Sequence, residues 1–413
     1  MGTISDLAEK LWSGETSPDV RHPWLPLHEI EELDRGLAFV SSFANVAAVE
    51  TDDGLVLIDT GSFLLAQQVH GAVRSWSGRP LHTAIYTHGH VDHVFGTAVF
   101  DAEARDRGWR VPRVIAHEGV PARFDRYVKT AGLNRAINAR QFRAAGLEWP
   151  TNYRYPDETY REATTLEIGG VRFELHHGRG ETDDHTWTWI PDRRILLTGD
   201  LFIWATPNAG NPQKVQRYPG EWAHALREMA KLGAELLCPG HGLPIRGEAR
   251  VRRALDETAE LLEVLHDDTL RLMNQGATLE EILRTVRAPA HLLERPYLQP
   301  IYDEPEFVVR NVWRLYGGWY DGNPAHLKPA PEASLAREIA VLSGGAARLA
   351  TRATELARDG ELALACHLVE LAAQAAPGDE SIRRVRADVY RQRAAGERSL
   401  MARGIFTTAA EGR

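Results

Sequence analysis

One short segment of this chain gathers side chains that bind metal ions. Residues 86–93 read Tyr-Thr-His-Gly-His-Val-Asp-His, so three imidazoles and one carboxylate fall within six residues. Imidazole nitrogen and carboxylate oxygen are the ligands that zinc and similar divalent ions prefer. On an extended segment His88 and His90 project the same way, while Asp92 and His93 can turn toward a second point. The loop can therefore supply half of the ligands of two adjacent metal ions, and this spacing disfavours a merely solvated surface loop.

This His-x-His-x-Asp-His pattern resembles that of the metallo-β-lactamase superfamily of binuclear metal hydrolases. Ahead of it, the apolar segment 54–58 runs into Asp59 and a glycine turn. The resemblance implies that Asp59 orients the metal ligands without binding metal itself, and an aspartate that only caps the turn is the alternative. Two later apolar segments end in Asp200 and His241. By the same resemblance, these are the bridging carboxylate and the last ligand of the second metal.

The ligand that completes the first metal differs from the common pattern. Most of the superfamily places a histidine in a Gly-His-Thr-x-Gly-His turn, whereas residues 180–185 read Gly-Glu-Thr-Asp-Asp-His and carry Glu181 instead. The zinc-dependent alkyl sulfatases of the superfamily have a glutamate there. Their second acidic ligand follows at the interval that separates Glu181 from Asp200. A carboxylate ligand adds negative charge and makes the metal a weaker Lewis acid.

Three further histidines lie close to Glu181 in the sequence. His176 and His177 are rival ligands that rank below Glu181, because alternation along a strand directs only one of them inward. For His185, a hydrogen bond beside the metals is favoured over direct ligation. The prediction is two Zn²⁺ per chain, the first bound by His88, His90 and Glu181, the second by Asp92, His93 and His241, with Asp200 bridging.

The chemistry expected of such a centre is hydrolysis by a metal-activated hydroxide. Two metals lower the pKa of a shared water from roughly 15.7 toward about 7. Asp92 and Asp200 are the carboxylates predicted to take part in catalysis, and no serine or cysteine nucleophile is required.

A loop after the bridging ligand carries candidate substrate-binding residues. Residues 207–217 correspond loosely to the place where alkyl sulfatases hold their sulfate with arginine. The residues predicted to bind the substrate are Asn208, Lys214 and Arg217. For the two cations, a solvated position on the surface is the alternative.

The pattern of apolar residues changes once along the chain. Strand-like and helical segments alternate from about residue 35 to 250, and the rest is almost entirely helical. The alternation predicts a layered α/β architecture followed by an all-helical domain, and the resemblance implies that the α/β part is a metallo-β-lactamase αββα sandwich. The predicted catalytic domain covers 1–248, with a helical insertion at about 121–161. That insertion is either a lid or wall of the substrate site or an ordinary surface excursion. The predicted helical domain covers 249–413 and is partly similar to tetratricopeptide repeats.

The helical part supports the alkyl sulfatase resemblance independently of the metal loop. Segments 265–276 and 316–327 resemble that family's helical dimerisation domain, which implies a homodimer. Alkyl sulfatases continue past the point that corresponds to Arg413 into a lipid-carrier-like domain. The resemblance therefore implies an enzyme without this apolar domain, and a weak dependence of activity on alkyl chain length.

Composition limits the partners and the compartment. The net charge of −9 argues against nucleic acid, which requires a basic face. No apolar run approaches the roughly 20 residues that span a bilayer, and no secretory signal is visible. The two cysteines, Cys238 and Cys366, fall in different predicted domains, so a disulfide framework is not expected and the cytoplasm is the predicted location.

Together these features predict a binuclear zinc hydrolase that cleaves a sulfate ester, with a small anionic ester as substrate. Hydrolysis of another ester, such as a lactone, thioester or phosphoester, is the alternative. A non-catalytic helical scaffold with a decayed site is disfavoured, because every type of ligand is present in the sequence.

Overall fold

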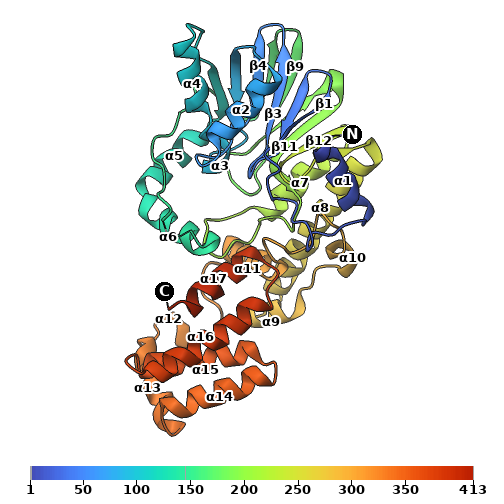
Figure 1. Cartoon of the computed structure of the whole chain (residues 1–413). Helices are drawn as coiled ribbons and strands as arrows, with labels where there is room; N and C mark the ends of the chain where they lie inside the picture. The colour runs from blue at the N-terminus through green and yellow to red at the C-terminus, as the bar shows by residue number, and fades with distance from the viewer. Residues whose placement is uncertain (1, 145, 413) are drawn as a thin grey trace. The chain divides into compact units, whose positions relative to one another are not determined.

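The computed structural model describes residues 2–144 and 146–412 (Figure 1). Residue 145, within the predicted insertion, and the terminal residues 1 and 413 lie outside the described residues. The chain divides into two compact units. The first comprises the residues up to 131, 149–277 and 281–316, and the second comprises 132–148, 278–280 and the residues from 317 onward.

The first unit contains two β-sheets. One has seven strands in sequence order, namely β1 (Ile30–Asp34), β2 (Leu37–Val40), β3 (Val46–Thr51), β4 (Gly54–Ile58), β5 (Leu81–Ile85), β6 (Arg113–His117) and β7 (Glu158–Tyr160). The other has the order β13-β12-β11-β10-β9-β8, with β8 (Ala163–Ile168), β9 (Val171–His177), β10 (Thr186–Ile190), β11 (Ile195–Ile203), β12 (Leu236–His241) and β13 (Ile245–Arg246). Pairing is antiparallel except from β4 to β7 and between β11 and β12.

Helices cover the outer faces of both sheets (Figure 1). On the first sheet lie α2 (Ala66–Trp76) and α4 (Thr97–Asp106), and on the second lie α7 (Pro219–Ala230) and α8 (Glu248–Asn274). Strands β4 and β11 are buried along their whole length, as expected of central strands covered on both faces. The predicted αββα sandwich is confirmed.

The remaining helices before residue 320 are α1 (Thr3–Ser13), α3 (Val91–Val94), α5 (Val120–Lys129), α6 (Ala131–Phe142), α9 (Leu279–Thr285), α10 (Ala290–Leu293) and α11 (Pro305–Gly317).

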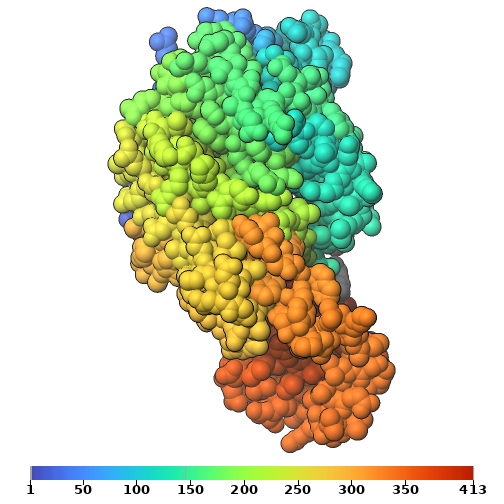
Figure 2. All heavy atoms as spheres, turned by 180° about the vertical axis from the view of Figure 1, so that it is seen from behind, coloured from blue at the N-terminus to red at the C-terminus, as the bar shows by residue number. Residues whose placement is uncertain are grey.

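The C-terminal part of the chain is helical, as predicted. Its helices form one packed body, coloured orange to red in Figure 2, and are α12 (Pro324–Leu327), α13 (Glu332–Leu342), α14 (Ala346–Arg358), α15 (Leu362–Ala375), α16 (Glu380–Ala395) and α17 (Leu400–Ala410). Small and branched side chains such as Ala353, Val369 and Val389 make up their core. The domain boundary at residue 248, the bounds of the insertion and the partial tetratricopeptide similarity stay predictions. Among the described residues, no helix is both long and apolar enough to cross a membrane.

The ends of parallel strands position the candidate site. Strands β4 and β5 are paired through Ile58 and Ile85, so Asp59 and the loop after β5 leave the first sheet at the same edge. In the second sheet, β11 is paired with β12, which ends at His241. The register of β11 shifts at Gly199, which has a φ of +50°. A Cβ atom there would lie 2.6 Å from Cε1 of His185, so only glycine allows this approach.

Candidate metal centre

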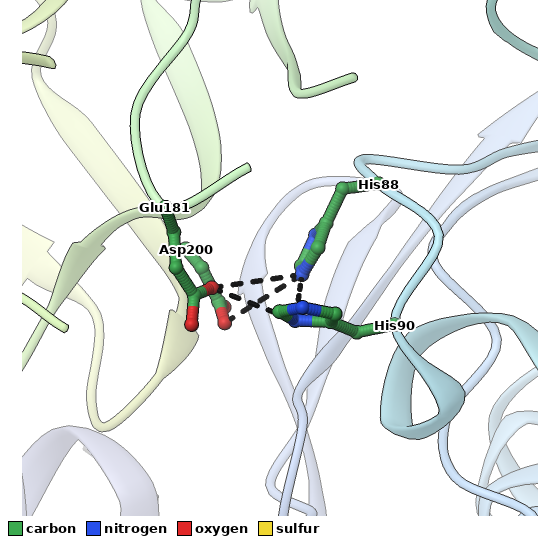
Figure 3. Close-up of side chains that lie close together, drawn as sticks. All are labelled: His88, His90, Glu181 and Asp200. Carbon is green, nitrogen blue, oxygen red and sulfur yellow. Dashed lines mark hydrogen bonds and ion pairs between the residues drawn. The ribbon is translucent and has the colours of Figure 1, made fainter. Parts of the chain in front are cut away.

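Two groups of metal-binding side chains meet where the two sheets end. The first group is His88, His90, Glu181 and Asp200, whose polar atoms point toward one another (Figure 3). His88 Nε2 lies 3.7 Å from Glu181 Oε2 and 3.8 Å from Asp200 Oδ2, and His90 Nδ1 lies 3.6 Å from Glu181 Oε2. One ion between these atoms would have two imidazole and two carboxylate ligands.

The second group lies next to Asp200. Its members are Asp92, His93 and His241, whose ligand atoms lie within 4.8 Å of one another. His93 Nε2 is 3.4 Å from Asp200 Oδ1, and His241 Nε2 is 3.3 Å from Asp200 Oδ2 and 3.4 Å from Asp92 Oδ2. The Asp200 carboxylate therefore faces both groups, which is the geometry that a bridging ligand requires.

Hydrogen bonds on the far side of the rings orient the imidazoles. Asp59 accepts hydrogen bonds from the Thr87 amide and hydroxyl, each at 2.8 Å, and lies 2.6 Å from His93 Nδ1. Since the Thr87 hydroxyl donates to Asp59, its oxygen can accept from His88 Nδ1 at 2.9 Å. His241 Nδ1 donates to the carbonyl of Phe43, which can only accept. In all three rings Nδ1 is engaged in this way and Nε2 faces the centre, which is the orientation that metal ligation needs.

The centre contains buried polar atoms without hydrogen-bond partners. They include His93 Nε2 and Asp200 Oδ1, which lie 3.4 Å apart, and Glu181 Oε2, which lies 3.7 Å from His88 Nε2. Burial raises the pKa of Glu181 to about 8, with Asp200 adding to the effect and Arg217 opposing it. Orphaned acceptors and crowded carboxylates are costly in a protein interior unless a cation neutralises them. The donor set therefore fits a divalent metal.

Of the predicted residues beside the metals, the structure places Asp59 and His185 directly behind the ligands. His185 Nε2 accepts a hydrogen bond from the Asp200 amide at 3.0 Å, and its ring stacks on His88 at 4.6 Å between centroids. The rival ligands lie elsewhere. His176 stacks on Trp187, and His177 stacks on His117 with centroids 3.8 Å apart.

The predicted substrate-binding residues gather around Glu181. Asn208 donates a hydrogen bond to the Glu181 carboxylate, and Arg217 donates one to the Glu181 carbonyl. Arg217 is 1% exposed, so it is not a solvated surface charge. Lys214 is half-buried, with its ammonium group 5.8 Å from the centre of the Trp149 ring.

Several residues that support the centre gave no signal in the sequence. Trp24, from the segment before β1, stacks on His241 with centroids 4.6 Å apart and contacts Tyr302 at 4.3 Å. Arg123 of α5 and Asp184 lie behind the loop that carries His88 and His90. Trp24, Tyr302 and Arg123 belong to no motif, and Asp184 lies within the 180–185 turn, but its contact with the histidine loop is visible only in the tertiary fold.

The comparisons with known proteins agree with this arrangement. Residues 41–241 match the metallo-beta-lactamase superfamily, and residues 278–412 match the family described as alkyl sulfatase dimerisation. A linear primary-alkylsulfatase from Pseudomonas sp. (strain ATCC 19151) is 27% identical over 365 residues, which cover 83% of this chain and 69% of that enzyme. An (R)-specific secondary-alkylsulfatase from Pseudomonas sp. is 26% identical over 397 residues, which cover 89% of this chain and 59% of that enzyme.

A solved structure supports the fold. The stereoselective inverting sec-alkylsulfatase of Pseudomonas sp. superposes with a TM-score of 0.82 at 24% identity, covering 92% of this chain and 65% of that one. This chain thus spans between 59% and 69% of the length of these three relatives. The predicted resemblance and fold are confirmed.

The ligand role of Glu181 can be tested by comparison with its nearest rival. Glu181→Ala should release the ion of the first group, because it removes one of two carboxylates that face His88 and His90. His177→Ala is the matched control and should keep the metal, since the His177 ring stacks on His117 and belongs to neither ligand group. Elemental analysis of desalted protein measures both. Full metal content in Glu181→Ala together with a loss in His177→Ala would contradict the assignment.

Proposed function

We propose that this chain, in which a metallo-β-lactamase domain precedes an alkyl sulfatase dimerisation domain, is a metal-dependent hydrolase of sulfate esters. The observation that carries the proposal is the arrangement around Glu181. A glutamate in the ligand-bearing turn contacts a buried arginine, Arg217, and a buried amide, Asn208. This combination joins a metal centre to cationic and polar groups that can hold an anion.

Two zinc ions are the proposed cofactor. The ligands would be His88, His90 and Glu181 for one ion and Asp92, His93 and His241 for the other, with Asp200 shared. When bound, zinc supplies Lewis acidity and a water acidic enough to act as a nucleophile near neutral pH. Nitrogen and carboxylate ligands in sets of this size are typical of zinc sites.

The chain's own residues would bind and orient the ester. Arg217 Nε is buried without a hydrogen-bond partner, and the same is true of Asn208 Oδ1 and Asn211 Nδ2. Buried polar atoms in this state are expected to meet a ligand or water. Lys214 adds a second cation, and it lies close enough to Arg217 for the charge of Arg217 to lower the pKa of Lys214. We therefore assign sulfate binding to Arg217 and Lys214, with Asn208 holding Glu181 in place.

The substrate class is tested by an activity screen. Protein loaded with Zn²⁺ should hydrolyse short and medium alkyl sulfates faster than lactones, thioesters or phosphodiesters, with a weak dependence on chain length. Chelator treatment should abolish this activity and added Zn²⁺ should restore it. Faster hydrolysis of a neutral lactone than of any sulfate ester would favour the alternative, a hydrolase of the same fold that acts on another ester.

Lys214 predicts a pH dependence of substrate binding. Burial, followed by the charge of Arg217, lowers the pKa of the Lys214 ammonium group to about 8. Below this pH the group is cationic and attracts a sulfate, and above it the attraction is lost. KM for an alkyl sulfate should therefore rise about tenfold between pH 7 and pH 9.5, the low end for a charge-assisted bond, with a smaller change in kcat.

Two variants control this measurement. Lys214→Arg should keep a flat KM across the same range, because its guanidinium stays protonated. Lys231→Met, at an exposed position on the surface, should behave like the parent protein. An equal rise of KM in the parent and in Lys214→Arg would show that another group titrates.

A homodimer is the proposed assembly. It is supported by the match of residues 278–412 to the alkyl sulfatase dimerisation family and by exposed apolar side chains on α13. Val341 and Leu342 are 75% and 83% exposed, which is unusual for adjacent large apolar residues. Leu342→Asp should shift the sedimentation of the protein toward a monomer, whereas Val20→Asp, at a position 81% exposed in the first unit, should not. A parent protein that sediments as a monomer at micromolar concentration would contradict the proposal.

The cytoplasmic location also remains a proposal. It is supported by the two cysteines, Cys238 and Cys366, which are both free thiols.

A further inference from the structure

The loop that carries His88 and His90 is braced from behind by a buried ion pair. Gly89, between the two histidines, donates its amide hydrogen to Oδ2 of Asp184 at 3.1 Å. The same oxygen lies 2.7 Å from Nε of Arg123, on α5. The side chains of Arg123 and Asp184 are 2% and 0% exposed. A carboxylate from the Glu181 turn thus connects the histidine loop to a helix of the predicted insertion.

The packing around Gly89 leaves little room for movement. A Cβ atom on Gly89 would lie 2.8 Å from Cδ of Arg123 and 3.1 Å from Oδ2 of Asp184. A Cβ atom on Gly119, just before α5, would lie 3.0 Å from Cβ of Asp184. Both glycines therefore allow the backbone to approach the Arg123–Asp184 ion pair closely. The ion pair is packed between the histidine loop and the start of α5.

Asp184 is close in sequence or in space to each segment that carries a ligand of the first group. It is three residues after Glu181 and directly before His185, which accepts a hydrogen bond from the Asp200 amide. Its carboxylate holds the backbone between His88 and His90. The charge of Arg123 lowers the pKa of the Asp184 carboxyl against the effect of burial, so the group is held as an anion that accepts hydrogen bonds.

We infer that Arg123 and Asp184 are positioning residues for the first metal site, acting through the amide of Gly89. The inference rests on the proposed metal site. Neither residue belongs to the two ligand groups. The ion pair fixes the histidine loop relative to Glu181, so that the two imidazoles and the carboxylate meet at one point before metal arrives. Residues that hold ligands in this way typically contribute ten- to a hundredfold to metal affinity.

The test separates the acceptor for Gly89 from the charges of the pair. Removing one partner alone would leave a buried, unpaired charge and destabilise the protein for an unrelated reason. Two double variants avoid this. Arg123→Met with Asp184→Asn removes both charges but keeps an amide oxygen that can accept from Gly89, whereas Arg123→Met with Asp184→Leu removes both charges and the acceptor.

The readout is the affinity for Zn²⁺, measured by competition with a chromophoric chelator and independent of hydrolysis. The variant with asparagine should bind Zn²⁺ nearly as tightly as the parent at both sites. The variant with leucine should bind about ten- to a hundredfold more weakly at one site and unchanged at the other. The absorption spectrum of Co²⁺-loaded protein should change only in the leucine variant, because it reports the geometry of the ligands.

Two single variants keep the test decisive if a double variant does not fold. Arg123→Lys preserves the charge that pairs with Asp184 and should bind Zn²⁺ nearly as tightly as the parent. Asp183→Asn is the matched control, since Asp183 contacts the same guanidinium but is 48% exposed and does not accept from Gly89. It should bind Zn²⁺ like the parent.

Two results would overturn the inference. One is parent affinity at both sites in the leucine variant, and the other is equal weakening in the asparagine and leucine variants. A parent protein that binds no Zn²⁺ would instead overturn the proposed metal site, and the inference with it.

Discussion

The structure depends on one electrostatic constraint, which is the burial of several carboxylates around a single point. Asp59, Asp92, Glu181 and Asp200 all lie within or directly behind the two ligand groups. Taking such charges out of water costs several kcal/mol for each ion. Without a metal, part of this cost is offset by His93 and His241, whose pKa values the neighbouring carboxylates raise against the effect of burial. A divalent cation bound between the carboxylates would neutralise their charge. The sheets, the hydrogen bonds behind the rings and the covering helices hold the ligands in the positions that such a cation requires.

The constraint explains why the strands and loops that carry the ligands are held in place by neighbouring elements. Strand β12 ends in a ligand, and Asp200 lies within β11, where its backbone amide donates a hydrogen bond to His185. The loop after β5 carries the remaining histidines, and its position is fixed by hydrogen bonds to Asp59. Rigid elements hold a site more accurately than loops do, and a metal centre tolerates little error in the distances between its ligands.

The sequence was informative where chemistry is encoded locally. The histidine loop, the acidic residues Glu181 and Asp200 and the strand before His241 each form a short pattern, and the structure brings these residues together. The alternating strands and helices indicated a layered α/β architecture, and the resemblance carried by the motifs supplied the αββα sandwich. The contributions of Trp24 and Arg123 were not predictable. Both residues come from segments that are far from the metal-binding motifs in the sequence, and no local pattern shows that these segments fold next to the centre.

The centre also depends on residues beyond the segment that matches the metallo-β-lactamase superfamily, which ends at residue 241. The Thr206 hydroxyl and amide donate to the carbonyls of residues 298 and 299, and Asp303 accepts a hydrogen bond from the Gly210 amide at 2.7 Å. A Cβ atom on Gly210 would collide with the backbone of residues 307 and 308, so the contact requires glycine. Burial raises the pKa of Asp303 to about 7. Because Asn208 lies between these anchored positions and contacts Glu181, the stretch from residue 298 to 308 helps to shape the first ligand group, and all of it belongs to the first compact unit. The site is therefore a product of the αββα sandwich and of the helical segment that follows it, not of the sandwich alone.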